Sequence, residues 1–418
     1  MKQYDSYKDS GVEWIGEVPS HWEIVPLKFT GEFSNGLTYS PKDVVDYGIL
    51  VLRSSNIQNS SLSFEDNVYV SNVSKALLVQ KGDVIICSRN GSAALVGKSA
   101  FIDKDINATF GAFMMRYIPK INKKYGFYLF QTAIGRYKGY FATTTINQLT
   151  KSTIGEMKVP LANTEEQTAI VDFLDKKCSE IDHVISAQQK RIALLQELKQ
   201  SVITHAVTKG LNPNVEMDAA EEDWINRLPA SWGKAKLKYY IHLVNGRAYS
   251  QPELLSEGKY KVLRVGNFFT NDTWYYSNME LEEDKYCNNG DLLYAWSASF
   301  GPYIWNQDRT IYHYHIWKVC YNECMDKMYV YYMLKAITNF KLGDIHGSTM
   351  VHITMESMNN SIIPIPSLDE QKDIASYLDK KCASIDSSIS KAQHQVDLLQ
   401  EYKQSLINEV VTGKRKVC

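Results

Sequence analysis

Two segments of the chain, residues 165–208 and 369–412, carry Ile, Leu and Val at near-heptad spacing among Glu, Lys and Gln. Neither segment contains Pro or Gly. An apolar stripe with this period and a polar remainder is typical of a long amphipathic helix. The pattern therefore predicts one such helix in each segment.

Both predicted helices have suitable end residues. The N-cap candidates are Asn163, Thr164 and Ser367, and the C-terminal stops are Gly210 and Gly413. About 44 residues at 1.5 Å each give a helix on the order of 65 Å long. A small domain alone cannot bury so long a stripe, so we expect the two helices to pack on each other, antiparallel, as a coiled coil.

The apolar stripes are the predicted contact surfaces of these helices. Their residues are Ile181, Ile185, Ile192, Leu195, Leu198 and Val202 in the first segment, and Ile385, Ile389, Val396, Leu399, Leu406 and Val410 in the second. Apolar helix faces also indicate that the chain is more stable when partner proteins are bound. The candidates for binding partner proteins are Ile181, Ile185, Ile192, Leu195, Ile385, Ile389, Val396 and Leu399.

The regions before the two helices have a different pattern. Residues of about 20–160 and 230–364 contain short runs rich in Val, Ile, Tyr, Phe and Trp, broken by Gly, Asn, Asp and Ser. Such runs indicate β-strands joined by turns. Some helix is expected around residues 125–137 and 328–340.

The chain is also an internal repeat, which organises the whole prediction. EEQTAIVDFLDKKCSEID, from residue 165, and DEQKDIASYLDKKCASID, from residue 369, open an alignment that continues without a gap, with about half of its positions identical. Upstream, IGEVPSHW at residues 15–22 corresponds to INRLPASW at residues 225–232. Between such anchors the halves diverge, so each half is one module with a variable globular part and a constant helix.

The predicted fold class is therefore α+β. Two β-rich domains are joined by two long antiparallel coiled-coil helices in a pseudo-two-fold repeat. The expected boundaries are 1–160 for the first β-rich domain, 161–212 for the central helix, 213–364 for the second β-rich domain and 365–418 for the C-terminal helix.

The charge of the whole chain does not identify a class of ligand, but the charge of one region does. The formal net charge is −1, a mild argument against a protein that binds nucleic acid over its whole surface. Residues 20–160, however, hold about sixteen Lys and Arg against ten Asp and Glu, the local excess that a phosphate-facing surface needs. Residues 230–364 are nearly balanced.

Composition also bears on location. There is no run of eighteen apolar residues and no secretory signal pattern at the start, so neither a membrane span nor export is expected. An odd count of seven cysteines without an export signal indicates reduced thiols and a cytoplasmic protein. Cys320 and Cys324 are four apart without a second such pair, which favours structural thiols over a zinc site.

Three loops in each β-rich domain carry side chains that can read base edges. Arg pairs with guanine, Asn or Gln with adenine, and Ser or Thr with either. In the first domain the candidates are Arg53, Ser54, Ser55, Asn56, Ser88, Arg89, Asn90, Ser92, Thr144, Thr145, Asn147 and Gln148. In the second they are Arg264, Asn267, Trp296, Ser297, Ser299, His346, Ser348, Thr349 and His352. Each polar residue is equally a candidate turn or cap residue.

Two of these positions recur in both halves. Arg53 matches Arg264, and Asn56 matches Asn267. Residues shared by both modules can instead hold phosphates or the scaffold, whereas residues that differ are better candidates for sequence readout.

No catalytic signature is present. The chain has no Walker A loop, no Gly-rich nucleotide loop and no Asn-Pro-Pro-aromatic motif. His313 and His315 would share a strand face, as metal ligands do, but without a third ligand a buried aromatic strand is favoured. We expect a non-catalytic chain without a metal or cofactor of its own.

Over essentially its whole length the chain resembles the specificity subunits of type I restriction–modification systems. The resemblance rests on WIGEVPSHWEIVPLK and its copy DWINRLPASWGKAKLK, on KGDVIICSRNGS, and on the junctions VPLANTEEQTAIVDFLDKKC and IPIPSLDEQKDIASYLDKKC. The second domain departs from the pattern, with AWSASFG in place of SRNGS.

The resemblance implies a DNA reader within a larger complex. Each β-rich domain would be a target-recognition domain that binds one half of a split site on double-stranded DNA. The helices would set the separation, two methyltransferase subunits would dock on them, and motor-nuclease subunits would join. S-adenosylmethionine, used for methylation of adenine N6, and ATP with magnesium would belong to those partners.

Two other classes of function remain open. One is an assembly or adaptor protein whose coiled coil and globular domains bind protein partners. The other is a nuclease or methyltransferase with an unrecognised site, which methyl transfer by the purified chain alone would reveal.

Overall fold

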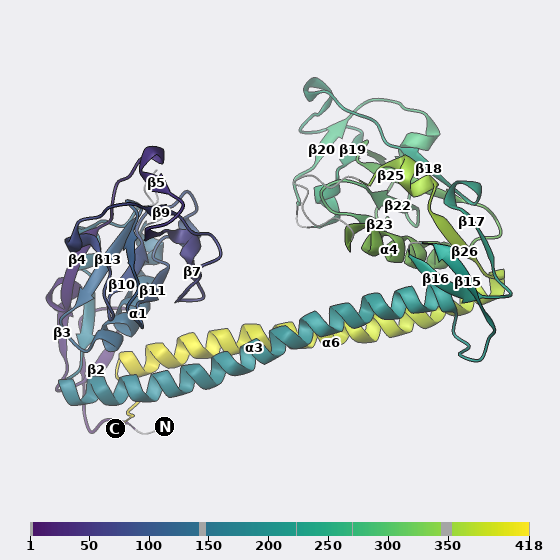
Figure 1. Ribbon diagram of the computed structural model, residues 1–418. Coiled ribbons are helices and arrows are strands. Elements are labelled where there is room, and N and C mark those ends of the chain that lie inside the picture. The colour runs from purple at the N-terminus through teal and green to yellow at the C-terminus, as the bar shows by residue number, and fades with distance from the viewer. Residues whose placement is uncertain (1–2, 142–147, 223, 270, 344–352, 418) are drawn as a thin grey trace. The chain divides into compact units, whose positions relative to one another are not determined.

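The computed structural model describes residues 3–141, 148–222, 224–269, 271–343 and 353–417. The chain forms two compact units (Figure 1). Unit 1 comprises Met1–Ala187 together with Gln395–Cys418, and unit 2 comprises Gln188–His394. Each unit contains one β-rich head and a part of each long helix, α3 (Thr164–Lys209) and α6 (Leu368–Val411).

The head of unit 1 is built on two four-stranded sheets. The first is antiparallel, in the order β11 (Ser99–Phe101), β10 (Val84–Cys87), β13 (Met114–Pro119) and β4 (Gly31–Asn35). The second has the order β12 (Ala108–Phe110), β6 (Ile49–Leu52), β9 (Tyr69–Val70) and β5 (Val44–Val45), with β12 and β6 parallel. Strands β10 and β13 are buried along almost their whole length, which explains why nearly all their residues except Arg116 are apolar.

Shorter elements complete this head. Hairpins pair β1 (Tyr7–Asp9) with β2 (Glu17–Pro19) and β7 (Ile57–Gln58) with β8 (Ser61–Leu62). Strand β3 (Glu23–Pro26) pairs with β14 (Lys158–Leu161), so the two ends of the head meet directly before α3. Helices α1 (Lys123–Phe141) and α2 (Lys151–Gly155) follow β13.

Unit 2 repeats this architecture. Its first sheet has the order β18 (Ile241–Asn245), β25 (Ile316–Tyr321), β22 (Leu292–Ala295) and β23 (Gly301–Ile304). The second has the order β20 (Tyr275–Ser277), β19 (Tyr260–Leu263), β24 (Thr310–Tyr312) and β21 (Tyr286–Cys287), with β19 and β24 parallel. The remaining elements are β15 (Met217–Glu222), β16 (Ile225–Pro229), β17 (Gly233–Lys236), α4 (Lys327–Gly343), α5 (Met355–Asn359) and β26 (Ile362–Ile365).

The ends of the long helices agree with the sequence prediction. Asn163 caps α3 by accepting a hydrogen bond from the backbone N–H of Glu166 at 2.9 Å. Ser367 caps α6 in a reciprocal arrangement, because its hydroxyl accepts from the backbone N–H of Glu370 while its own backbone N–H donates to the Glu370 carboxylate. Gly210 and Gly413 follow the last turns with φ of 72° and 73°, a backbone conformation that glycine adopts without a Cβ penalty.

The helices pack on each other within each unit. In unit 1, Ile181 and Ile185 of α3 share a core with Val396 and Leu406 of α6. In unit 2, Ile203 of the last turns of α3 shares a core with residues of the first turns of α6. The early part of one helix thus lies beside the late part of the other, which confirms the antiparallel pair. None of the helices in the described residues is long and apolar enough to span a membrane.

A matched ion pair braces the helices in each unit. Lys403 contacts Asp182 at 2.6 Å in unit 1, and Lys199 contacts Asp386 at 2.6 Å in unit 2. The two pairs occupy equivalent positions of the repeat. Because these side chains are partly exposed, each pair fixes register more than it adds stability.

A buried tryptophan anchors each head to the start of a long helix. Trp22 is fully buried, and its indole N–H donates to the Glu166 carboxylate of α3 at 3.0 Å. Trp232 makes the equivalent bond to Glu370 of α6 at 3.2 Å. The sequence repeat is therefore also a structural repeat of head and helix start.

Candidate DNA interface

The first predicted loop of unit 1 is organised by Asn56, which is fully buried. Its Oδ1 accepts a hydrogen bond from the backbone N–H of Arg53 at 2.9 Å. Its Nδ2 donates to the carbonyls of Ser63 and Asp66, both at 3.1 Å. The side chain is committed to the backbone of its own loop, which is the scaffold role left open above.

Asn267 plays the same part in unit 2. It accepts from the backbone N–H of Arg264 at 3.1 Å and donates to the carbonyls of Asn271 and Thr273 at 2.9 and 3.1 Å. A buried or half-buried amide with all these groups satisfied stabilises one loop conformation. Recurrence of this asparagine in both halves therefore reflects loop geometry.

The two arginines that precede these loops differ in their surroundings. Arg53 forms an ion pair with Asp66 at 2.7 Å and also donates to its carbonyl. Arg264 is exposed and lies over the Tyr275 ring at 5.3 Å. Within the described part of unit 2, no carboxylate lies at ion-pair distance from Arg264, so its charge stays available to an anion or a base edge.

The second predicted loop of unit 1 lies against the first. Asn90 donates to the Ser54 hydroxyl at 3.3 Å and accepts from the backbone N–H of Ser92 at 3.0 Å. Lys98 donates to the Ser54 carbonyl at 3.4 Å. The fold thus brings both loops into one surface, with Ser55 and Arg89 exposed on it.

Ser88 has a structural role within this surface. It is buried, and its hydroxyl donates to the Phe113 carbonyl at 3.0 Å. Its own carbonyl accepts from Leu149, and Arg89 forms an isolated β-bridge with Gln148. The start of the segment after the third predicted loop is therefore held beside Arg89.

The third loops carry the remaining candidates. Thr144, Thr145 and Asn147 in unit 1, and His346, Ser348, Thr349 and His352 in unit 2, lie outside the described residues. Their assignment to base contacts stays a prediction. Gln148 is described and exposed.

The second loop of unit 2 has a different construction from its counterpart. The Trp296 indole N–H donates to the Tyr314 carbonyl at 2.8 Å, and its ring packs against those of Tyr314, His315 and Trp317. Ser297 and Ser299 follow in a tight turn around Ala298, whose φ is 65°. Trp296 is thus part of a cluster of aromatic rings, and the two serines follow it in the loop.

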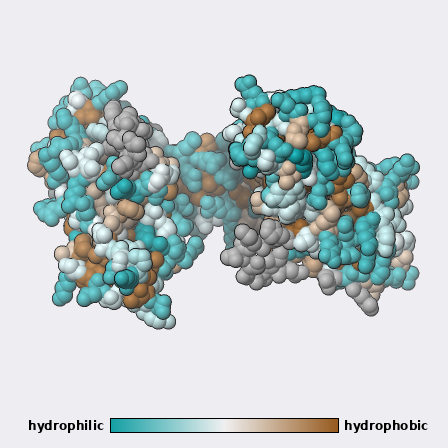
Figure 2. Space-filling view, turned by 90° about the horizontal axis from the view of Figure 1, so that it is seen from above, coloured by the Kyte–Doolittle hydropathy of each residue, from teal (hydrophilic) through white to brown (hydrophobic). Residues whose placement is uncertain are grey.

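Sequence reasoning missed a turn beside the second loop of each unit. Residues 111–113 connect β12 to β13, and residues 313–315 connect β24 to β25. Figure 2 shows mostly hydrophilic residues on the face in view, with small hydrophobic patches. Two large side chains of these turns are exposed, Phe113 at 61% and Tyr314 at 38%. The missed signal is an aromatic residue in the short link between two strands.

The prediction that His313 and His315 belong to a buried strand was wrong. Strand β24 ends at Tyr312 and β25 begins at Ile316, because the chain turns between the two sheets there. Burial, with His315 and Arg264 nearby, lowers the pKa of His313 to about 4. The ring is therefore neutral at pH 7 and offers one donor and one acceptor. The described residues contain no cluster of three potential metal ligands.

The helix residues proposed to bind partners need a correction. Ile181, Ile185, Ile385 and Val396 are at most 9% exposed because they fill the seam inside the chain. Half-buried positions complete the stripe at Ile192, Leu195, Ile389 and Leu399. Several apolar residues are exposed on another face of each helix, among them Leu194, Leu198, Leu398 and Tyr402. The prediction that Leu198 belongs to the seam was therefore wrong. Heptad spacing identifies a seam but not the partner that fills it.

Comparison with known proteins agrees with this architecture. A family model described as "Type I restriction modification DNA specificity domain" matches residues 19–192 and again residues 229–395. A solved structure from work on complex assembly and conformational transition of the type I R-M system aligns with 94% of this chain and 98% of its own, with a TM-score of 0.69 and 15% identity. That likeness shows the fold.

Curated relatives are similar along the same regions. The MjaX specificity subunit assigned to a type I restriction enzyme of Methanocaldococcus jannaschii is 26% identical, over 96% of each chain. The EcoKI specificity subunit of Escherichia coli is 25% identical over 67% of this chain and 62% of its own. With two family domains covering most of its length, this chain belongs to the type I restriction–modification DNA specificity family.

Proposed function

We propose that this protein is the DNA-specificity subunit of a type I restriction–modification complex, in which each unit reads one half of an asymmetric, bipartite site. One observation carries the proposal. The two heads share a framework down to the loop asparagines, yet differ at matched positions of the second loop, where unit 1 has the exposed Arg89 and unit 2 the half-buried Ser297. A common scaffold with different polar surfaces suits two readers of different sequences.

The catalytic work would belong to partner subunits. The proposed partners are two adenine-N6 methyltransferase subunits and motor-nuclease subunits on double-stranded DNA in the cytoplasm. S-adenosylmethionine, and ATP with magnesium, would be bound by those partners. This chain would select the DNA sequence. Its net charge of −1 is compatible with partners that provide many of the phosphate contacts.

Exchange of one head tests the modular reading. Residues 23–161 should be replaced by the same segment of a relative with another target, so that β3 and β14 move as a pair. We expect the half-site of unit 1 to change, while the other half-site and the spacer stay as they are. Sequencing of methylated adenines in cells that also express the methyltransferase subunit reports all three.

Two outcomes would count against the proposal. A change in both half-sites would contradict independent reading by the two heads. A wild-type complex that assembles but produces no methylation motif and no specific band shift would favour the adaptor alternative.

The constant helices offer a matched docking surface in each unit. Leu194 and Leu198 on α3 in unit 2 are 56% and 47% exposed. Leu398 and Tyr402 occupy the equivalent positions on α6 in unit 1 and are 49% and 51% exposed. A pair of apolar residues one helical turn apart forms a strip that suits a partner helix. Duplication of the strip supports one methyltransferase subunit per unit.

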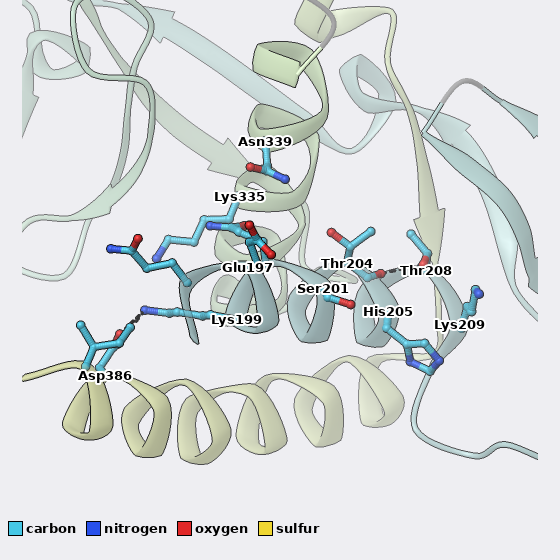
Figure 3. A pocket seen from close by; sticks show the side chains of 13 residues that line it. Glu197, Lys199, Ser201, Thr204, His205, Thr208, Lys209, Lys335, Asn339 and Asp386 are labelled. Carbon is cyan, nitrogen blue, oxygen red and sulfur yellow. Dashed lines mark hydrogen bonds and ion pairs between the residues drawn. The ribbon is translucent and has the colours of Figure 1, made fainter. Parts of the chain in front are cut away.

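A groove lies on the same helix turns. In unit 2 it has a volume of about 930 Å³ and is lined by α3, by Lys335 and Asn339 of α4, and by Asp386 of α6 (Figure 3). Glu197, Ser201 and Thr204 of α3 face it. In unit 1 a groove at the equivalent place is lined by α1 and by Glu401, Gln404 and Ser405 of α6. Polar grooves beside an apolar strip give a partner both contact area and orientation.

Charge substitution in the strips tests this docking. Leu198→Glu should remove one methyltransferase subunit from the complex, and Leu198→Glu with Tyr402→Glu should remove both. A buried carboxylate without a partner opposes association. Mass measurement of the purified complex checks the stoichiometry.

Val184→Glu is the matched control. Val184 is 44% exposed on α3, but its equivalent in the repeat is Ser388, so it is not part of a duplicated strip. Loss of a subunit in this control, or retention of both in the double variant, would place the docking site elsewhere.

A further inference from the structure

We propose that the turn Gly111–Phe113 and its counterpart His313–His315 are the specificity elements of the two units, and that Arg89, stacked on Phe113, reads a guanine in the half-site of unit 1. This inference rests on the proposed function. It adds a reading element that the sequence motifs did not indicate, together with the base that one residue recognises.

In both units the last carbonyl of the turn accepts a backbone hydrogen bond from the second loop. The Phe113 carbonyl accepts from the backbone N–H groups of Ser88 and Arg89 at 3.0 and 3.1 Å. The His315 carbonyl accepts from the backbone N–H of Trp296 at 3.2 Å. Each turn is thereby tied to the second loop of its own unit, with Phe113 and His315 at equivalent positions.

Two glycines make this close packing possible. A Cβ on Gly36 would lie 2.1 Å from the Gly111 carbonyl oxygen, and one on Gly246 would lie 2.4 Å from that of His313. Only glycine permits so close an approach of two backbones. Each module therefore needs a glycine at this position to hold the turn in place, although the residues of the turn itself differ between the two modules.

Unit 1 presents an arginine and an aromatic ring on this turn. The Arg89 guanidinium lies 5.4 Å from the centroid of the Phe113 ring. Arg89 has no carboxylate at ion-pair distance in the described residues of unit 1, whereas Arg53 is paired with Asp66. A guanidinium held on an aromatic face and free of a counter-ion can turn its fork of donors to O6 and N7 of guanine.

Unit 2 has other chemistry at the same place. Ser297 replaces Arg89, and the turn reads His313, Tyr314 and His315. The neutral His313 ring and the partly exposed Tyr314 offer uncharged donors and acceptors. If unit 2 reads bases through these groups, recognition of its half-site does not depend on an arginine–guanine contact at this position.

A cation–aromatic pair that belongs to the constant framework differs from the Arg89–Phe113 pair in being present in both units. Lys28 lies 5.5 Å from the Phe29 ring, and Lys238 lies 5.5 Å from the Tyr239 ring. Phe29 is 70% exposed and Tyr239 is 64% exposed. This pair recurs in both modules, so it cannot distinguish their half-sites, whereas the Arg89–Phe113 pair occurs only in unit 1.

Competition binding by the complex with the methyltransferase subunit tests the assignment. With Arg89→Ala, discrimination at one guanine of the half-site should fall about 10- to 100-fold, the range for loss of one bidentate pair. The other half-site should be unchanged. Tyr314→Ala should alter only the half-site of unit 2.

Graded variants separate reading from general support. Arg89→Lys keeps the charge but loses the fork, so it should lose discrimination nearly as far as alanine. Phe113→Leu should weaken discrimination at the same base pair, and Phe113→Trp should retain it, since the role of the ring is to position Arg89. Phe29→Ala is the matched control and should change no position of the motif.

Three results would overturn the inference. Arg89→Ala could weaken binding equally for all sequences and lower the salt dependence by about one phosphate contact, which would make Arg89 a phosphate ligand. Phe113→Leu could leave the motif intact, or Phe29→Ala could change it. A wild-type complex without a bipartite methylation motif would instead refute the proposed function.

Discussion

Insertion of seven residues at both places where the chain passes between the units, Ala187/Gln188 and His394/Gln395, is expected to lengthen the unread spacer of the target site. Seven residues preserve the heptad phase of the seam. They lengthen each helix by about 10 Å at 1.5 Å per residue. At roughly 3.4 Å per base pair, this corresponds to at most three additional base pairs. The methylation motif should show both half-sites unchanged and a longer gap.

An insertion after Leu195 in α3 alone is the informative control. This site lies inside unit 2, so the extra residues would displace Lys199 from Asp386 and move Ile203 out of its core. We expect this variant to fold poorly and not to read a longer site. If the paired insertions left the spacer unchanged in an intact complex, the helices would not set the separation of the half-sites.

Replacement of Trp22 by alanine is expected to cause the largest loss of stability. Removal of a fully buried tryptophan typically costs about 3–5 kcal/mol. It also leaves the Glu166 carboxylate without one of its donors, at the start of α3. Urea denaturation of the whole chain measures the free energy of unfolding, and hydrogen exchange at the start of α3 shows whether unit 1 is the part affected.

Trp22→Phe separates packing from hydrogen bonding. It keeps most of the ring in the core but removes the indole N–H, so the loss should be about 1–3 kcal/mol. Phe29→Ala, at a 70% exposed position, should stay within about 0.5 kcal/mol of wild type. A Trp22→Ala protein as stable as wild type would mean that the head does not depend on this anchor.

The long helices were predictable because their signals are local. Heptad spacing, Ser367 ahead of an acidic turn and Gly413 after the last turn all lie within a few residues of the structure they specify. Strand pairing is not local in this sense. The parallel contact between β6 and β12 joins segments far apart in sequence, so the strands could be recognised but not their partners.

The candidate interface was predictable in outline only. Polar loops after strands were identified by residue type, and the structure brings Ser54 and Asn90 together. Residue type could not show that Asn56 is fully buried and bonded to its own loop. An aromatic residue in a β-rich segment usually indicates core, so residue type could not show that Phe113 is 61% exposed.

The division of the helices between the units has an evolutionary consequence. The head of unit 1 is completed by the end of α6, which belongs to the second module, and the head of unit 2 by the end of α3, which belongs to the first. A single-module ancestor would therefore have lacked part of its own core and would have folded as a homodimer with exchanged helices. Such a dimer would have recognised a palindrome. Fusion of two copies of the module into one chain would remove this symmetry and let the two halves diverge toward different sequences.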